Sequence, residues 1–246
     1  MKRLLVAGAM AGTMVVASLA VAAPTNAATP VVHPGDYMES SIGACTLGFA
    51  FNGTGSKAGN VYFATAAHCV DHVNEDIRLL SGTIIGDVAA IGNAATTAAD
   101  WALIKVRDQY EGGVRGAVRG HPTFPRGYTK PSETAQFDLV RFSGYGMGFD
   151  LLPLTRESRL GLLGSDSGET YDLIGLDTFG DSGGPVMHDK TGKALGLVSR
   201  GCGIALVVIT VPLVCPGPIA TSLGPTVQGI LAKAAAKGFT VSLRTA

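Results

Sequence analysis

Short apolar segments, each followed by turn-forming residues, recur along this chain and limit the folds that it can adopt. Gly, Asn, Asp and Pro separate the segments, and the 246 residues include 34 glycines. Many short strands with frequent turns are typical of an antiparallel sandwich or barrel, whereas the strand–helix alternation of a parallel sheet is missing. The expected strands lie within residues 45–51, 61–67, 77–80, 84–91, 101–106, 139–142, 171–176 and 194–198.

One helix is predicted near the C-terminus. Pro225 suits a first helical position, because its fixed φ matches the helix and its missing N–H would have no partner there. Lys233 and Lys237 favour the C-terminal end, and Gly238 can cap it. We expect this helix to pack on the body of the protein through one apolar face. The residues of that face are Val227, Ile230, Leu231 and Ala234.

The N-terminal segment 1–28 has the composition of an export signal. Two basic residues precede a mostly apolar, uncharged stretch at 4–23, and small residues offer cleavage after residue 22, 27 or 28. A transmembrane anchor is the alternative, but the Ala and Gly content, the terminal position and the following Pro24 favour a cleaved signal. The most apolar later stretch, 204–214, is too short to span a membrane. We therefore expect a secreted protein with no membrane attachment after cleavage.

The charge balance and the cysteine content limit which partners, disulfides and metal sites can be expected. Basic and acidic residues number 19 each, so there is no electrostatic reason to expect a nucleic-acid partner. Four cysteines in an exported chain predict disulfides, which can pair in three ways. We predict the local pairing, Cys45 with Cys69 and Cys202 with Cys215. Zinc is the rival interpretation, but the sequence has no Cys-x-x-Cys or His-Glu-x-x-His pattern, so we expect neither metal nor cofactor.

Residues 179–185, Phe-Gly-Asp-Ser-Gly-Gly-Pro, do not have the pattern of an ordinary strand or helix. Glycines on both sides of the Asp181-Ser182 pair let the backbone turn sharply and leave space for another molecule. Backbone N–H groups in such a turn can point at one spot beside the serine hydroxyl, as an oxyanion hole requires. A glycine-rich turn with a capping Ser or Asp is the alternative interpretation.

Two further patterns precede this one along the chain. Residues 65–69 place His68 at the end of an apolar strand, and residues 100–106 place Asp100 just ahead of another. Each alone is more often a loop or turn residue. Together with Ser182 they supply a base, an acid and a hydroxyl in an exported, β-rich chain, and this combination favours nucleophilic catalysis.

With these three motifs, the chain resembles the chymotrypsin-like serine proteases, and within them the bacterial, streptogrisin-like branch. The resemblance runs from about Cys45 to the terminal helix. It implies two packed six-stranded antiparallel β-barrels with a C-terminal helix, His68 and Asp100 on the first barrel and Ser182 on the second. The expected division is a signal peptide at 1–28, a first barrel at 29–125, and a second barrel with the terminal helix at 126–246. Segment 112–136, rich in Gly and Pro, is either the connection between the halves or a long surface loop.

The resemblance also assigns roles that fit the chemistry of these residues. Ser182 would be the nucleophile, His68 the base that takes and returns its proton, and Asp100 the group that orients and stabilises the imidazole. The N–H groups of Gly180 and Ser182 would bind the developing oxyanion. The competing acids match the family pattern less well; they are Asp71, Asp76, Asp87 and Asp108.

Asp181 has its own role in this family, a buried ion pair that shapes the oxyanion hole. No Ile-Val-Gly-Gly-like start is present to supply a free N-terminal cation, and bacterial relatives use an internal arginine instead. Arg141, which precedes Gly144-Tyr145-Gly146, is the predicted partner of Asp181.

For substrate recognition, residues 199–201 resemble the segment that pairs with the substrate backbone, with Ser199 at its start and Gly201 keeping the side-chain pocket open. The floor of that pocket falls near Leu176, beside Asp177. Leu176 at the floor predicts a preference for apolar side chains, whereas Asp177 pointing inward predicts a preference for Arg or Lys. The sequence leaves both alternatives open.

The resulting hypothesis is a secreted, monomeric serine endopeptidase that acts on proteins or peptides. A protease-fold binding protein without activity is the first alternative. An esterase is the second, because Gly180-x-Ser182-x-Gly184 also fits the nucleophile turn of α/β-hydrolases; their chain order of Ser, acid, His is not found here. Asp166-Ser167-Gly168 lacks the flanking glycines and is predicted to be a simple turn.

Overall fold

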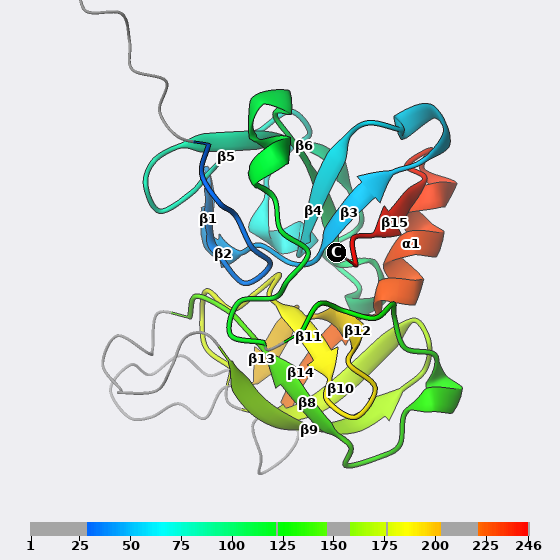
Figure 1. The fold of residues 1–246 in the computed structure, drawn as a ribbon. Helices are drawn as coiled ribbons and strands as arrows, with labels where there is room; N and C mark the ends of the chain where they lie inside the picture. The colour runs from blue at the N-terminus through cyan, green and yellow to red at the C-terminus, as the bar shows by residue number, and fades with distance from the viewer. Residues whose placement is uncertain (1–28, 122, 147–157, 176, 203–220, 246) are drawn as a thin grey trace, which may run out of the picture.

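The computed structural model describes residues 29–121, 123–146, 158–175, 177–202 and 221–245. These residues form two antiparallel β-sheets, one above the other, with one α-helix beside them (Figure 1). The expected fold class, a double β-barrel with a C-terminal helix, is confirmed. The predicted signal peptide, Leu176 and Cys215 lie outside the described residues, as does segment 204–214. None of the helices in the described ranges is long and apolar enough to cross a membrane.

The first sheet has the strand order β15-β3-β4-β7-β6-β5-β1-β2. Seven of its eight strands come from the first half of the chain in closely spaced antiparallel pairs. Strand β6 alternates for the most part between buried and less buried residues, as a strand with one core face should. Its strands are β1 Tyr37–Ser40, β2 Gly43–Thr46, β3 Ala50–Gly53, β4 Val61–Thr65, β5 Asp76–Arg78, β6 Ile84–Ile91, β7 Ala102–Val106 and β15 Val241–Leu243.

The second sheet has the order β12-β11-β8-β9-β10-β14-β13. Its strands are β8 Leu139–Phe142, β9 Arg159–Asp166, β10 Thr170–Gly175, β11 Pro185–His188, β12 Lys193–Leu197, β13 Arg200–Cys202 and β14 Thr221–Pro225. Short 3₁₀ helices occupy the connections: η1 Gly55–Lys57, η2 Ala67–Cys69, η3 Thr97–Ala99, η4 Asp108–Gly113 and η5 Pro131–Glu133. Residues 166–168 close the β9–β10 hairpin, which confirms the predicted turn.

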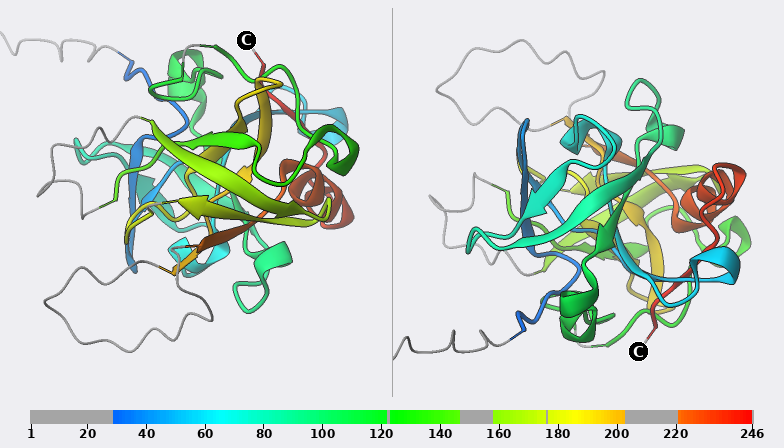
Figure 2. Two further views of the ribbon diagram at one scale, coloured as in Figure 1. Left: turned by 90° about the horizontal axis from the view of Figure 1, so that it is seen from below. Right: turned by 90° about the horizontal axis from the view of Figure 1, so that it is seen from above.

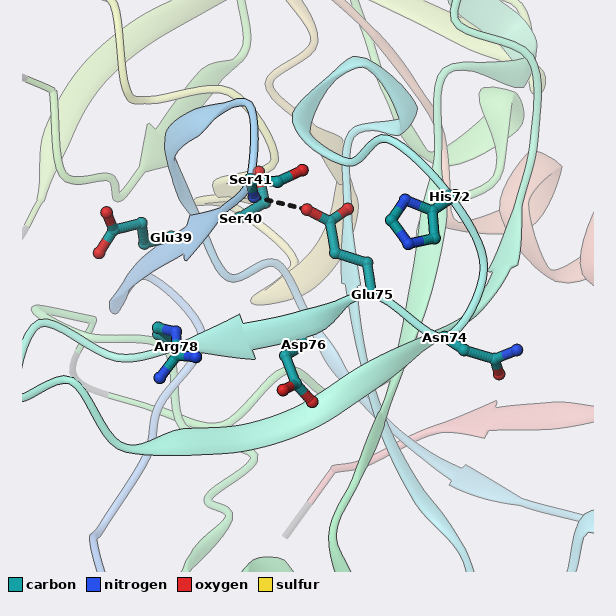
Figure 3. A pocket seen from close by; sticks show the side chains of 8 residues that line it. All are labelled: Glu39, Ser40, Ser41, His72, Asn74, Glu75, Asp76 and Arg78. Carbon is teal, nitrogen blue, oxygen red and sulfur yellow. Dashed lines mark hydrogen bonds between the residues drawn. The ribbon is translucent and has the colours of Figure 1, made fainter.

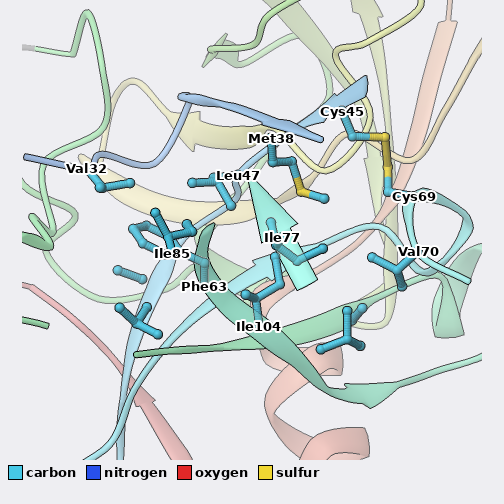
Figure 4. Packing of buried hydrophobic residues seen from close by; sticks show 14 of the residues in the cluster. Val32, Met38, Cys45, Leu47, Phe63, Cys69, Val70, Ile77, Ile85 and Ile104 are labelled. Atoms are coloured by element: carbon cyan, nitrogen blue, oxygen red, sulfur yellow. A yellow bond between two sulfur atoms is a disulfide. The ribbon is translucent and has the colours of Figure 1, made fainter. Parts of the chain in front are cut away.

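Three apolar clusters form the core of the protein. One fills the first sheet and includes Met38, Phe63 and Ile77, with the Cys45–Cys69 disulfide at its edge (Figure 4). A second cluster lies within the second sheet and includes Phe142. The third joins residues from both sheets and the helix, with Trp101 fully buried within it. Because this shared cluster lies between the sheets, it fixes their relative position.

The helix α1 spans Val227–Ala236 and begins later than predicted. Pro225 ends strand β14, and Thr226 is the N-cap, where its hydroxyl accepts a hydrogen bond from the Gly229 N–H. Gly238 lies at φ +82° just after the helix, so its predicted capping role is confirmed. The chain then returns as β15, which pairs with β3 of the first sheet, and the helix and β15 lie on one side of the molecule (Figures 1 and 2).

Candidate active site

His68 lies in the short helix η2 directly after the buried strand β4. The next residue, Cys69, is bonded to Cys45 on β2, with 6.1 Å between their Cα atoms, so the first predicted disulfide is present. The bridge fixes the backbone next to His68 while leaving 36% of the imidazole side chain exposed. The second predicted pair includes Cys215 and lies outside the described residues.

Asp100 lies at the end of η3, just before β7, and is completely buried. Strands β4 and β7 are paired, with Thr65 opposite Ala102. The end of β4 therefore lies beside the start of β7, and the chain segments that carry His68 and Asp100 meet there. Nδ1 of His68 is 2.8 Å from Oδ2 of Asp100, and the His68 backbone N–H donates to Oδ1 at 3.0 Å. The two side chains are therefore brought together as the sequence motifs suggested.

Ser199 completes the surroundings of Asp100, because its hydroxyl also donates to Oδ2. Burial raises the pKa of Asp100, but the hydrogen bonds from the His68 ring, the Ser199 hydroxyl and the His68 backbone outweigh it, so the pKa falls below its usual value. The group is thus a carboxylate at neutral pH. It accepts the Nδ1–H of His68 and leaves Nε2 as the ring atom that can take a proton.

Ser182 lies in the loop between β10 and β11, and backbone contacts fix this loop against the first sheet. The Thr46 N–H donates to the Ser182 carbonyl at 2.9 Å, and the Thr46 hydroxyl donates to the Gly180 carbonyl at 2.7 Å. Gly183 has φ +86° and packs so closely that an added Cβ would be 2.2 Å from Oγ1 of Thr65. Ser182 is therefore held beside the end of β4, where η2 and His68 begin.

The hydroxyl of Ser182 makes no hydrogen bond to the His68 ring in the described part of the chain. Contacts of this kind are often long in structures without substrate and tighten when the reacting group binds. Gly180 has φ +101°, a conformation that glycine adopts without strain. Among the described residues, no acceptor takes the N–H of Gly180 or of Ser182, so both can serve a bound oxygen atom.

Asp181 is fully buried, and Arg159 is its partner. The two guanidinium nitrogens of Arg159 donate to the two carboxylate oxygens at 2.6 and 2.5 Å, and the N–H groups of Gly146 and Thr178 donate at 2.9 and 2.7 Å. The side chain of Arg159 is only 8% exposed. A bidentate pair of this kind fixes the carboxylate directly next to Ser182.

The prediction that Arg141 pairs with Asp181 is therefore wrong. Arg141 donates to Asp189 at 2.5 Å, and both side chains are about one-third exposed. The reason is the register of β8 and β9, which places Phe142 opposite Arg159 and sends the neighbouring Arg141 to the other face. The guanidinium of Arg159 lies over the ring of Phe142, 4.7 Å from its centroid.

The structure also shows where the competing acids and the predicted substrate-binding residues lie. Of the acids considered as partners of His68, only Asp100 contacts its ring in the described residues; Asp71, Asp76 and Asp108 form ion pairs with His72, Arg107 and Lys105. Ser199 contacts Asp100, and Gly201 lies on β13, the last strand of the second sheet. Asp177 is buried, with 7% of the residue exposed.

A separate pocket of about 390 Å³ lies between the β1–β2 hairpin and the loop after η2 (Figure 3). Glu75 joins its two walls: its carboxylate accepts the N–H of Ser41 at 2.5 Å and that of Asp71 at 2.8 Å. Burial raises the pKa of Glu75, but these hydrogen bonds outweigh it and the pKa is lowered. The pocket is acidic and does not include His68, Asp100 or Ser182; its lining is Glu39, Ser40, Ser41, His72, Asn74, Glu75, Asp76 and Arg78.

Replacing Glu75 with glutamine is expected to destabilise the fold by about 1–3 kcal/mol at pH 7, because the amide keeps only one acceptor oxygen and the hydrogen bonds from the Ser41 and Asp71 N–H groups lose their charged acceptor. Since the folded-state pKa of Glu75 is lowered, its stabilising effect is complete above the unfolded-state pKa and disappears as the pH falls through the folded-state pKa. Urea unfolding from pH 7 to pH 3 should thus show the two proteins converging at low pH. Glu39→Gln, at an exposed acid of the same pocket, is the control and should change stability little; an equal loss in both variants would contradict the assignment.

One group of potential metal ligands, Cys45, His68 and Cys69, occurs in the described residues. Its two sulfur atoms are bonded to each other, so neither is a thiolate that could bind a metal ion.

Two antiparallel β-barrel sheets, with a His–Asp pair on one and a glycine-flanked serine on the other, define the class of chymotrypsin-like proteins. Residues 37–212 match the Trypsin family, and the chain belongs to it. A comparison with curated proteins gave no match.

Solved structures with this fold include bacterial proteases. Protease A of Thermobifida fusca has a TM-score of 0.58 and 19% identity, over 87% of this chain and 99% of that one. The chymotrypsin of Cellulomonas bogoriensis has a TM-score of 0.56 and 20% identity, over 87% and 99%. A glutamic acid-specific serine protease, described as using a histidine triad in substrate binding, has a TM-score of 0.59 and 18% identity, over 87% and 100%. At these identities the likeness supports the fold alone.

Proposed function

We propose that this member of the trypsin family is a secreted serine endopeptidase that hydrolyses peptide bonds through an acyl-enzyme on Ser182. The observation that carries the proposal is the buried Asp100 carboxylate, which is bonded to Nδ1 of His68 beside the loop that carries Ser182. A purely structural ion pair would not require a partly exposed imidazole beside a loop that carries a serine flanked by glycines.

In the first half of the reaction, the Ser182 oxygen attacks the carbonyl carbon of the scissile bond while Nε2 of His68 takes the hydroxyl proton. The resulting imidazolium is stabilised by Asp100, whose charge is maintained by three hydrogen bonds. The negative oxygen of the tetrahedral intermediate accepts the N–H groups of Gly180 and Ser182. His68 then gives its proton to the leaving amine, the C–N bond breaks, and an ester to Ser182 remains.

In the second half, water enters the position left by the amine. His68 takes a proton from the water, the oxygen attacks the ester carbonyl, and the same two N–H groups bind the second oxyanion. Collapse of this intermediate returns the proton from His68 to the Ser182 oxygen and releases the new carboxyl terminus. The charges of Asp100 and His68 are restored, so the enzyme is ready for another cycle.

Secretion is supported by the Cys45–Cys69 disulfide, since such bridges persist in oxidising compartments, together with the signal-like composition of residues 1–28. An inactive binding protein of the same fold is the rival, and it would not need the base, acid and hydroxyl together. The α/β-hydrolase type of esterase does not fit the all-β fold.

Labelling with a small phosphonofluoridate tests the proposal, because this reagent reacts with an activated serine and needs no particular substrate side chain. We expect one adduct on the peptide that contains Ser182 in the folded protein, and a much slower reaction after unfolding. His68→Ala should slow the labelling by orders of magnitude, whereas His72→Ala, at an exposed histidine four residues away, should not. Absence of an adduct from correctly folded protein would exclude the enzyme and leave the binding protein.

A further inference from the structure

Thr46, the last residue of β2, is a fully buried polar residue to which the proposed reaction assigns no role. The preceding residue, Cys45, forms the disulfide to Cys69 beside His68 (Figure 4). Neighbouring side chains on a strand point to opposite faces, so Thr46 points away from that bridge and toward the second sheet. Two adjacent residues of β2 therefore contact the two halves of the candidate active site.

The hydroxyl of Thr46 connects two loops of the second sheet. Its Oγ1 atom is 2.9 Å from the backbone nitrogen of Tyr145, which follows β8, and 2.7 Å from the carbonyl oxygen of Gly180. A backbone N–H can only donate, so the Tyr145 N–H uses a lone pair of the hydroxyl. The single hydroxyl proton is then directed at the Gly180 carbonyl. An apolar side chain of the same size cannot make either bond.

The backbone of Thr46 holds the other end of the same turn. Its N–H donates to the Ser182 carbonyl at 2.9 Å, and its own carbonyl accepts the hydroxyl of Thr65, on β4, at 3.1 Å. The methyl group of Thr46 faces Gly184, where an added Cβ would lie 3.4 Å from it. Gly180 and Ser182 are the two residues whose N–H groups are proposed to bind the oxyanion. The carbonyls of both are thus bonded to Thr46.

The same two loops are joined a second time through Asp181. Its carboxylate accepts the N–H of Gly146 at 2.9 Å, one residue beyond the N–H that Thr46 accepts. The Thr46 hydroxyl and the Asp181 carboxylate therefore act on neighbouring residues of each loop. They differ in charge, because the hydroxyl stays neutral and its contribution does not depend on pH.

Gly180 needs an external contact to keep its conformation. It has φ +101°, and a glycine can leave this region at little cost because no Cβ restricts it. Phe179, the residue before it, has 78% of its surface exposed and does not anchor the turn by packing. Among the described residues, the Thr46 hydroxyl is the only donor to the Gly180 carbonyl. Without this bond the glycine can rotate, and its N–H no longer points at the same spot as the N–H of Ser182.

We propose that Thr46 is a positioning residue for the oxyanion hole. Its hydroxyl holds the Gly180 carbonyl so that the N–H groups of Gly180 and Ser182 converge on the oxygen of the tetrahedral intermediate. The inference rests on the proposed function of Ser182. Thr46 acts through the loop and does not touch the substrate. Because the two N–H groups bind the oxygen most strongly when it carries the negative charge, Thr46 contributes in the transition state more than in substrate binding.

The test is Thr46→Val, which keeps the size of the side chain and removes its hydroxyl. We expect kcat for a chromogenic peptide to fall by roughly 10–10²-fold, less than the loss of a whole oxyanion donor, while KM changes only a few-fold. A peptide aldehyde places its oxygen in the oxyanion hole once Ser182 adds to it, so its affinity should fall by the same factor as kcat/KM. The pH dependence of kcat/KM should keep its midpoint, because the His68–Asp100 pair is unchanged.

Thr226→Val is the matched control. The hydroxyl of this residue is also buried, donates to the Gly168 carbonyl at 2.6 Å and accepts the Gly229 N–H at 3.0 Å. This is the hydrogen-bond pattern of Thr46, placed at the start of α1. Both valine variants should unfold at a lower urea concentration, because each leaves a buried carbonyl and a buried N–H unpaired. Only Thr46→Val should lose activity and aldehyde affinity, and Thr46→Ser, which retains the hydroxyl, should stay within a few-fold of the wild type in both.

The outcomes separate this proposal from the function on which it rests. Absence of phosphonofluoridate labelling at Ser182 in the wild type would remove the proposed function itself. Normal labelling, with kcat and aldehyde affinity unchanged in Thr46→Val or lowered equally in Thr226→Val, would leave the endopeptidase and overturn the role of Thr46.

If Thr46→Val does not fold, Thr46→Ala and Thr46→Ser are compared, since neither adds an atom to the buried site. The serine variant should keep kcat and aldehyde affinity, and the alanine variant should lose both. Equal values in these two variants would overturn the proposal, and so would a loss in Thr46→Ser as large as that expected for Thr46→Val.

Discussion

Replacing Ser182 with alanine is expected to lower kcat by about 10⁶-fold, because the covalent route to the products is lost. The His68–Asp100 pair and the N–H groups of the loop would remain, so a residual rate of roughly 10³–10⁴ over the uncatalysed reaction is expected from binding and oxyanion stabilisation. The measurement is kcat for a chromogenic peptide, with circular dichroism and urea unfolding used to show that the variant folds normally.

The matched control is Ser167→Ala, in the β9–β10 turn, where Asp166-Ser167-Gly168 has a locally similar sequence. The Ser167 hydroxyl contacts Thr170 at the surface, so its loss should leave kcat unchanged. Equal activity of the wild type and Ser182→Ala would rule out Ser182 as the nucleophile, and a comparable loss in Ser167→Ala would show that the effect is not specific to it.

Replacing Arg159 with alanine is expected to destabilise the protein by about 3–5 kcal/mol, since it leaves the Asp181 carboxylate buried without its cation. Asp181 lies between the two residues whose N–H groups are proposed to bind the oxyanion. A shift of this loop should therefore also lower kcat by about 10²–10³-fold, the effect of losing one oxyanion donor. Urea unfolding and peptide hydrolysis would measure the two effects.

Arg141→Ala provides the comparison, because it removes an arginine from the paired neighbouring strand. Its partner, Asp189, is about one-third exposed, so the expected loss is at most about 1 kcal/mol and kcat should not change. Arg159→Lys retains the charge without the two-nitrogen contact and should lie between the two alanine variants. Equal effects of Arg141→Ala and Arg159→Ala would contradict the assigned ion pair.

Much of the fold was predictable because the decisive signals are local. Each expected strand segment overlaps an observed strand, since short apolar runs bounded by Gly and Asn indicate where strands lie. The segment 45–51 is the exception in detail, because it covers the end of β2 and the start of β3. The close contact of His68 with Asp100 was expected from the resemblance to the serine proteases that their two motifs carry. The Cys45–Cys69 bridge was anticipated from an even cysteine count and short separation.

The incorrect predictions involve residues whose partners depend on strand register. Nothing in the sequence near Arg159 indicates that β9 will place it opposite Phe142 and against Asp181. Pro225 is compatible with a helix start, but its pairing with Thr170 extends β14 through it. The terminal strand β15 is too short to be recognised alone, and it exists because β3 provides an edge with which it pairs.

The most direct test of the account is to trap the intermediate. The purified protein would be mixed with a good peptide ester substrate, quenched in acid within milliseconds, and measured by intact mass and then by peptide mapping. The account predicts a protein mass increased by that of the acyl group, carried by the peptide that contains Ser182 and absent from Ser182→Ala. Rapid hydrolysis of the substrate without any acylated Ser182, or an adduct on another residue, would contradict it.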